Sequence, residues 1–160
     1  MSESLKTRIM RWSFNLFPAY RRSGGRITFI SSDIKQLRVK IPLNWKTRNY
    51  VGTIYGGCMY GAVDPIYMVM FIKLLGSGYI VWDKSATIQY ASPGRSTLQA
   101  RFEIEDDELE FIKSKLDREG KTDRTYQIEL LDGDNKVCAL IEKTLYFRNK
   151  NFVANEAHTN

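Results

Sequence analysis

Two adjacent glycines and one aspartate are the residues of this chain whose types and spacing best suit chemistry. Gly56 and Gly57 open a run of apolar and aromatic residues, and Asp64 follows seven residues later, directly before Pro65. A helix that starts at the glycines points free backbone N–H groups and its positive dipole end outward. Because glycine lets a ligand approach the backbone closely, this arrangement suits an oxyanion hole that binds a carbonyl oxygen.

Asp64 could complete such a site. It lies about two helical turns beyond Gly57, hence on roughly the same side of the helix. A carboxylate among Tyr60, Tyr67 and Met68 would be partly shielded from water and therefore a stronger base. It could activate water or attack a carbonyl itself. The alternative is structural, because aspartate before proline suits a break between two helices, with Asp64 capping the second.

Other catalytic chemistries have little support in the composition. The chain has one histidine, His158, close to its C-terminal end. Cys58 and Cys138 lie inside apolar segments without metal-ligand spacing, and we interpret them as reduced, buried thiols. We therefore expect no metal and no redox cofactor, so that carboxylates, hydroxyls, lysines and backbone dipoles must carry any reaction. The thiols and the lack of a secretory signal favour the cytoplasm.

The positive charge is concentrated near the start of the chain. The net charge is +6 over 160 residues, and six basic residues lie among the first 26: Lys6, Arg8, Arg11, Arg21, Arg22 and Arg26. No recognised nucleic-acid motif accompanies them, so we expect no nucleic-acid partner. A basic rim could instead attract the phosphates of a nucleotide-bearing substrate.

The first predicted element is an amphipathic helix over 5–17, with apolar residues at spacings of three to four: Leu5, Ile9, Trp12 and Leu16. Two interpretations of this basic, aromatic-bearing helix stay open. It could be a solvated helix docked on the domain, or it could touch an anionic membrane surface.

The remaining elements follow from periodicity and turn residues. Alternating or apolar runs predict strands over 26–31, 34–41, 79–90, 96–105, 124–131 and 136–147. An apolar helix over 56–75 ends at Gly76, and a shorter helix covers 107–118. We expect no membrane span, because no apolar run approaches the roughly 20 residues needed to cross a bilayer. As a helix of about 30 Å that is apolar nearly all round, 56–75 is typical of the centre of a domain.

These elements predict an α+β fold, in which an antiparallel sheet of about six strands wraps the central helix. Residues 1–22 would belong to the same domain as residues 23–150, and residues 151–160 would form a flexible tail. Because such a sheet has only one face covered, a second copy is expected to pack nearby.

Two basic residues could also belong to a site. Lys84 falls on the apolar face of its predicted strand, where a buried lysine needs a partner, and Asp64 is one candidate. That pairing would weaken Asp64 as a base; alternatively, Lys84 reaches solvent. Arg95, in the turn between two strands, could meet phosphate groups or be an ordinary solvated arginine.

The residues around the glycines carry a family resemblance. The run Asn49–x–x–Gly52–x–x–Tyr55–Gly56–Gly57, followed by Asp64, resembles the hotdog-fold thioesterases. Within them it is similar to the phenylacetyl-CoA thioesterase-like branch, which has Asn–x–x–Gly–x–x–His–Gly–Gly and then an aspartate. The segment "SATIQYASPGRSTLQARFEI" also resembles the strand–turn–strand region of that branch. The whole chain is most similar to an uncharacterised thioesterase-like hotdog subfamily.

The resemblance implies a role for each matching residue. Gly57 would polarise the thioester oxygen, and Asp64 would act as nucleophile or general base on substrate held by the partner subunit of a dimer. Asn49 would orient the thioester or the water. Tyr55 departs from the pattern because it stands where the family has histidine, and a phenol is a poor base at neutral pH.

The resemblance therefore implies an acyl-CoA or acyl-carrier-protein thioesterase that forms a homodimer or pairs again into a tetramer. Coenzyme A would be part of the substrate. The predicted substrate-binding residues are Tyr55, Gly56, Tyr60, Tyr67, Met68, Lys84 and Arg95. The alternative is a hotdog protein that binds acyl-CoA or lipid without turnover, at a membrane through residues 5–17.

Overall fold

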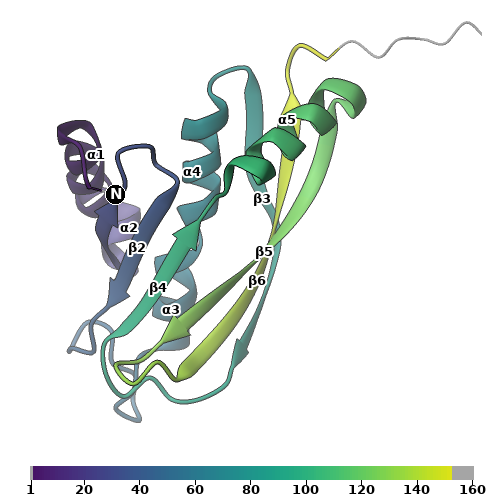
Figure 1. The fold of residues 1–160 in the computed structure, drawn as a ribbon. Coiled ribbons are helices and arrows are strands. Elements are labelled where there is room, and N and C mark those ends of the chain that lie inside the picture. The colour runs from purple at the N-terminus through teal and green to yellow at the C-terminus, as the bar shows by residue number, and fades with distance from the viewer. Residues whose placement is uncertain (1, 153–160) are drawn as a thin grey trace, which may run out of the picture.

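The computed structural model describes residues 2–152, and its six strands form one antiparallel sheet (Figure 1). The order across the sheet is β1-β2-β4-β5-β6-β3. The strands are β1 (Arg26–Ile30), β2 (Gln36–Ile41), β3 (Tyr79–Tyr90), β4 (Leu98–Glu103), β5 (Lys121–Leu131) and β6 (Val137–Asn149). The predicted antiparallel architecture is confirmed, and all but the first two residues of the predicted tail, 151–160, lie outside the described range.

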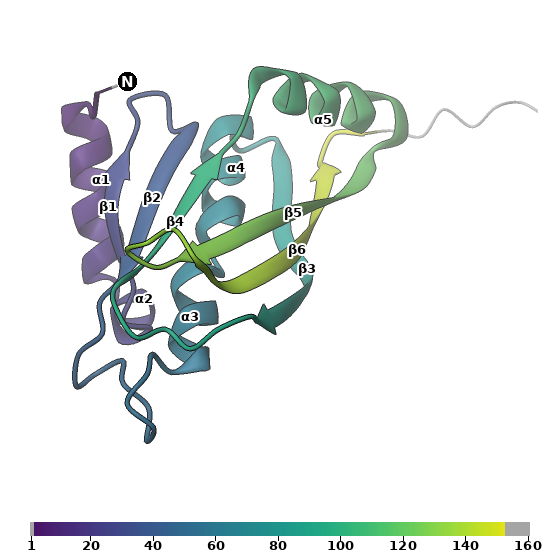
Figure 2. The same cartoon turned by 60° about the horizontal axis from the view of Figure 1, so that its bottom comes forward.

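Five helices accompany the sheet in the described residues: α1 (Leu5–Leu16), α2 (Pro18–Arg22), α3 (Gly56–Val63), α4 (Ile66–Leu75) and α5 (Asp106–Glu119). The sheet curves around α3 and α4, whereas α1 lies beside β1 at one side of the molecule (Figure 2). Strict alternation supplies the inner face of the sheet. In β4, for example, Leu98, Ala100 and Phe102 are buried and the residues between them are exposed, as their alternation predicts.

The central helix is broken at the Asp64–Pro65 pair. α3 ends at Val63 and α4 begins at Ile66, because Pro65 has no N–H to donate to the preceding turn. The predicted break is confirmed, but the predicted cap is wrong, since no side chain caps the start of α4. The helix ends at Gly76, as predicted, with a positive φ of 84° that glycine adopts without strain.

By length and apolar composition, the 20-residue segment Gly56–Leu75 could cross a membrane, contrary to our expectation. About half of this apolar segment is nevertheless buried within the protein. Met70 and Phe71 are completely buried beneath the sheet. An all-round apolar helix is what the centre of this fold requires, so we assign Gly56–Leu75 as its core helix.

Helix α1 presents its apolar stripe to solvent. Ser4 begins the helix with a capping box, in which its side chain accepts from the Thr7 N–H and Thr7 bonds back. Thr7 is buried, and Met10 and Phe14 pack against the core. The predicted helix is confirmed, but its four regularly spaced apolar residues face away from the domain: Leu5, Ile9, Trp12 and Leu16.

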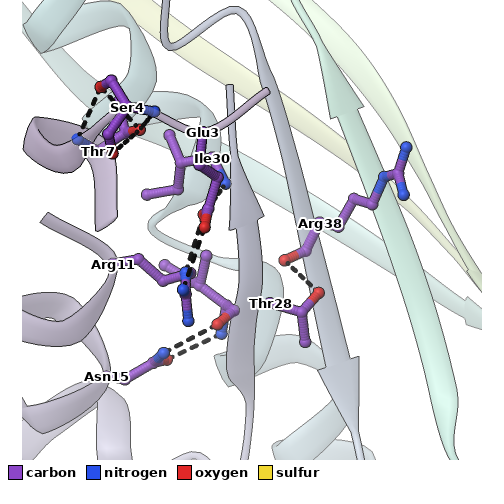
Figure 3. Close-up of polar contacts among 9 residues, drawn as sticks. Glu3, Ser4, Thr7, Arg11, Asn15, Thr28, Ile30 and Arg38 are labelled. Carbon is purple, nitrogen blue, oxygen red and sulfur yellow. Dashed lines mark hydrogen bonds and ion pairs between the residues drawn. The ribbon is translucent and has the colours of Figure 1, made fainter. Parts of the chain in front are cut away.

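Polar side chains attach α1 to the free edge of β1 (Figure 3). The Asn15 amide donates to the Ile27 carbonyl at 2.8 Å and accepts from the Ile27 N–H at 2.8 Å. The Glu3 carboxylate accepts from the Ile30 N–H at 3.0 Å and pairs with Arg11. These bonds satisfy backbone groups that would otherwise be exposed at the edge of the sheet.

The opposite edge of the sheet is β3, which pairs only with β6 among the described strands. A bulge between Asp83 and Ser85 shifts its register. The bulge changes which residues of β3 point inward. Before it, Val81 and Asp83 point inward and Trp82 is exposed. Of the two alternatives for Lys84, the core position is wrong and the solvent-exposed one is confirmed, because Lys84 pairs with Asp123 at the surface. Its role in substrate binding stays a prediction.

Candidate active site

The N-terminus of α3 presents unpaired backbone donors. Tyr55 is the N-cap residue, and its carbonyl accepts from the N–H groups of Cys58 and Met59. Within residues 2–152, the N–H groups of Gly56 and Gly57 donate to no other group of the protein. Gly57 is exposed. The predicted helix start, with free N–H groups at the positive end of its dipole, is thus present.

Two tyrosine rings lie close to the two glycines. A Cβ on Gly56 would lie 2.7 Å from the Tyr90 hydroxyl, and a Cβ on Gly57 would lie 2.4 Å from the Tyr55 ring. The rings thus lie where side chains would otherwise stand. Tyr90 was not predicted as a site residue, because its place beside the glycines depends on the pairing of a distant strand.

A cleft of about 510 Å³ opens at this helix start. Its walls come from the loop before α3, from the start of α3 and from the end of β3 with the residues after it. Much of the cleft lining is apolar or aromatic, and it includes Ile54, Tyr55, Met59, Tyr90, Ala91 and Pro93. The size and the mixed character fit a small-molecule site.

Asn49 lines the cleft, but its side chain organises the loop. Its Oδ1 accepts from the N–H groups of Val51 and Thr53 at 3.1 and 3.0 Å, and its Nδ2 donates to Thr53 Oγ1 at 2.9 Å. These bonds close a tight turn in which Gly52 has a φ of 84°. Asn49 therefore shapes the approach to Gly56, and its contact with substrate stays a prediction.

Asp64 pairs with a buried lysine. Lys143, on β6, donates from Nζ to Asp64 Oδ1 and lies 3.1 Å from Asp83 Oδ2. The Lys143 side chain is 1% exposed, whereas Asp64 is 38% exposed. The Tyr60 hydroxyl lies 3.4 Å from the same Nζ. One cation thus joins the broken central helix, the bulged edge strand and β6.

The electrostatics of this cluster favour an ionised lysine. Burial disfavours the Lys143 ammonium, but the hydrogen bond and charge of Asp64, together with Asp83, raise the pKa of Lys143 above its ordinary value. Burial raises the pKa of Asp83, although Lys143 opposes this. Asp83 Oδ1 is buried and has no partner among the described residues. Burial and the hydrogen bond to Asp64 also raise the pKa of Tyr60.

Lys143, and not the candidate Lys84, is the lysine that pairs with Asp64. Lys143 occupies the place expected for Lys84, and its own alternation contained the signal, since Ile141, Lys143 and Leu145 point to the same buried face. Lys84 cannot be assigned by alternation because the bulge lies at its own position. For the same reason, the sequence pattern does not reveal that Asp83 points inward.

The other predicted site residues are dispersed. Tyr67 is a core residue, stacked on Tyr126 with a centroid distance of 4.8 Å. Met68 is partly buried and packs against the core. Arg95 is exposed, two residues after Pro93 of the cleft. Their roles in substrate binding stay predictions. Within residues 2–152, no group of three or more histidine, cysteine, aspartate or glutamate side chains could hold a metal ion.

A six-stranded antiparallel sheet around one central helix defines a hotdog-fold protein, and comparison with known structures confirms this class. A probable thioesterase of Pseudomonas aeruginosa is similar over 93% of this chain and 99% of its own, with a TM-score of 0.82 and 17% identity. A thioesterase of Haemophilus influenzae matches over 96% of both chains, with a TM-score of 0.66 and 16% identity. A putative thioesterase of Shewanella oneidensis covers 89% of this chain and 96% of its own, with a TM-score of 0.66 and 21% identity.

The chain belongs to the family described as a domain of unknown function, DUF4442, whose model matches residues 6–147. Comparison with curated proteins finds no match. At these identities the structural neighbours establish the fold, and the site residues must argue for the chemistry.

Proposed function

We propose that this protein hydrolyses acyl thioesters carried on coenzyme A or on an acyl carrier protein. The observation that carries the proposal is the pair of unpaired N–H groups at Gly56 and Gly57, which face a cleft at the positive end of α3. Such donors stabilise the oxyanion that develops when a carbonyl is attacked. The names of the structural neighbours, one a thioesterase, one a probable and one a putative thioesterase, support the same reaction class.

The spacing along the helix supports a site shared between two subunits. Gly57 and Asp64 are seven residues apart, which corresponds to about 10 Å along a helix axis. Both must approach the reacting carbonyl to about 3 Å, so one helix cannot supply both. We therefore propose a homodimer in which Asp64 acts on substrate bound at Gly57 of the partner subunit.

In this mechanism Asp64 acts as a general base. Lys143 bonds to Asp64 Oδ1 and fixes the carboxylate, while more than a third of the side chain stays exposed. The carboxylate accepts a proton from water, whose oxygen attacks the thioester carbon, and the Gly57 N–H binds the oxyanion. The C–S bond then breaks, and the proton passes to the departing thiolate. Direct attack by Asp64 on the carbonyl is the variant of this mechanism.

The cleft lining favours an apolar acyl group. Tyr55, Tyr90 and Met59 offer aromatic and thioether contacts that suit an aliphatic chain or an aryl ring. Arg95 stands exposed beside this cleft, where it could meet coenzyme A phosphates. We propose a cytoplasmic location, in keeping with two free, buried cysteines.

The test is thiol release from a panel of acyl-CoAs by the natural protein and by Asp64→Asn. We expect a loss of about 100-fold or more in kcat with retained folding. Asp123→Asn is the matched control, because it removes a carboxylate from an exposed lysine pair and should leave kcat unchanged. Equal activity of Asp64→Asn and the natural protein would contradict the role of Asp64.

One observation favours a second function, the binding of acyl-CoA without turnover. The Tyr55 ring lies against Gly57, whose N–H the oxyanion would need. In that case, calorimetry with acyl-CoA would show binding by both the natural protein and Asp64→Asn, and neither would release thiol.

A further inference from the structure

We propose that the outer face of α1 and the basic groove beside it form a docking surface for an anionic lipid membrane. This inference goes beyond the proposed thioester chemistry and does not depend on it. The surface is defined by the apolar stripe Leu5, Ile9, Trp12 and Leu16 and by the groove in which Trp12 and Leu16 also take part.

The apolar stripe is narrow and fully turned to solvent. At 100° per residue its four members fall within an arc of about 60°. Their exposed fractions are 72% for Leu5, 59% for Ile9, 61% for Trp12 and 60% for Leu16. Lys6 and Arg8, both exposed, flank this arc on either side. An apolar stripe bordered by cations, with tryptophan among its members, is typical of a helix that lies in a membrane interface.

The adjoining groove, of about 850 Å³, is strongly basic. Six cations line it, and no acidic residue does: Arg11, Arg21, Arg22, Arg26, Lys40 and Lys46. Glu3 neutralises Arg11, whereas the other five form no ion pair with any residue of the described part of the chain. Five uncompensated cations beside an apolar stripe match the phosphate groups and acyl boundary of an anionic bilayer.

The orientation of α1 is fixed, so that the stripe is not available to the core. Asn15 and Glu3 bind the edge of β1 on the inner side of the helix. Thr7 is buried there. A helix that turned its stripe inward would have to release these bonds. The exposure of the stripe is thus a property of the fold rather than of a loosely attached segment.

Charge favours a membrane over a second copy of this chain as the occupant. A two-fold contact brings identical patches together, so the five cations of one copy would face those of the other. Such like-charge contact is unfavourable. An anionic lipid surface neutralises the same charges and takes up the apolar stripe in one contact.

The experiment is co-sedimentation of the full chain with vesicles of phosphatidylcholine or of equimolar phosphatidylcholine and phosphatidylglycerol. We expect binding to the anionic vesicles, little binding to the neutral ones, and release as salt screens the charges. Arg21→Gln/Arg22→Gln should lower partitioning by about 30-fold. Trp12→Ser/Leu16→Ser should lower it by about tenfold or more.

Matched control variants lie on α5, away from this surface. Lys113→Gln/Arg118→Gln removes the same charge, and Phe111→Ser removes an exposed aromatic side chain. Both should bind anionic vesicles as the natural protein does. Equal losses in the α1 and α5 variants, or equal binding to neutral and anionic vesicles, would overturn the proposal.

A second copy as the occupant would give a different result. Light scattering would then show a smaller assembly for Trp12→Ser/Leu16→Ser than for the natural protein, without any vesicle binding by either, and this outcome also overturns the proposal. None of these measurements depends on thioester hydrolysis. A failure of the membrane proposal can therefore be distinguished from a failure of the proposed catalysis.

Discussion

The two edges of the sheet are treated in opposite ways. At β1, a five-residue strand, Asn15 of α1 and Glu3, just before α1, bind two backbone donors and an acceptor. At β3, a strand of twelve residues, no strand within residues 2–152 pairs with the outer edge, and residues 84–87 are exposed. A long open edge can pair with another strand, and proteins protect edges that must not do so. The contrast indicates that β1 is closed against pairing and that β3 is available for it.

The polar groups near the two edges differ as well. Asn15 makes neutral hydrogen bonds to the backbone of β1. Near β3 the polar group is an ion cluster, in which Lys143 links Asp83 of the edge strand to Asp64 of the central helix. At β1 the Asn15 amide and the Glu3 carboxylate bind backbone groups of the edge strand, whereas at β3 an ion cluster between side chains holds the edge strand in place against the helix.

The largest effect is expected at the ion cluster. Lys143→Met leaves two carboxylates near one another without their cation and should lower the free energy of unfolding by about 3–5 kcal/mol. Urea denaturation measures the loss. Lys84→Met, which breaks the exposed pair with Asp123, should cost less than about 1 kcal/mol. Equal effects of the two variants would show that Lys143 does not hold β3 to the helix.

Opening the closed edge should have a smaller effect. Asn15→Ala removes two hydrogen bonds to Ile27 and should lower the free energy of unfolding by about 2 kcal/mol. Ser13→Ala, at an exposed position of the same helix, should change it by less than about 0.5 kcal/mol. Thermal unfolding of both variants is the measurement, and a stable Asn15→Ala would mean that α1 does not close the edge.

Charge placed on each edge tests which of them pairs. Ser85→Lys adds a cation beside Lys84 near the middle of β3, where a two-fold contact would bring like charges together. We expect dimerisation weaker by about tenfold or more, measured by light scattering against concentration. Thr28→Lys, on the outer side of β1, should leave the assembly unchanged. A dimer that responds to Thr28→Lys and not to Ser85→Lys would reverse the comparison.

The smallest expected effect is on the stability of the fold at acidic pH. Partial burial raises the pKa of Glu3, but hydrogen bonds from Arg11 and Ile30 outweigh this and hold the pKa below its ordinary value of 4.5. A lowered pKa stabilises the fold above the unfolded value, and the stabilisation is lost as pH falls through the folded value.

Glu3→Gln should therefore be less stable than the natural protein at neutral pH, by about 1 kcal/mol. The difference should shrink as pH falls below 4.5. Denaturation at several pH values measures it, and a difference that stays constant into acid would contradict a role for the Glu3 charge in closing the edge.

Much of the fold was predictable because it depends on local periodicity. The alternation of Leu37, Val39 and Ile41 fixes the inner face of β2, and all three are buried. The apolar run from Gly56 and the Gly76 stop predict the core helix. The predicted start of β2 at residue 34 is wrong, and the strand begins at Gln36, because Ile34 adopts a φ of 64° and the chain still turns there. A positive φ at a β-branched residue has no local sequence signal.

The site was predictable where it depends on one segment. Gly56 and Gly57 begin α3 and Asp64 directly follows its last residue, so their spacing in the sequence sets their distance along the helix axis. The partner of Asp64 is 79 residues away on another strand, and choosing between Lys84 and Lys143 requires the bulge in β3. The direction of the α1 stripe was likewise beyond local pattern, because Asn15 and Glu3 select the inner face through bonds to β1.

The buried lysine has a consequence for chemical durability. Thioesters acylate free amines, so an enzyme that holds them risks modifying its own lysines. Lys143 is 1% exposed, and the raised pKa keeps its nitrogen protonated. A protonated amine has no lone pair with which to attack an acyl donor. If the protein holds thioesters as proposed, the carboxylates that bind this lysine also protect it from self-acylation.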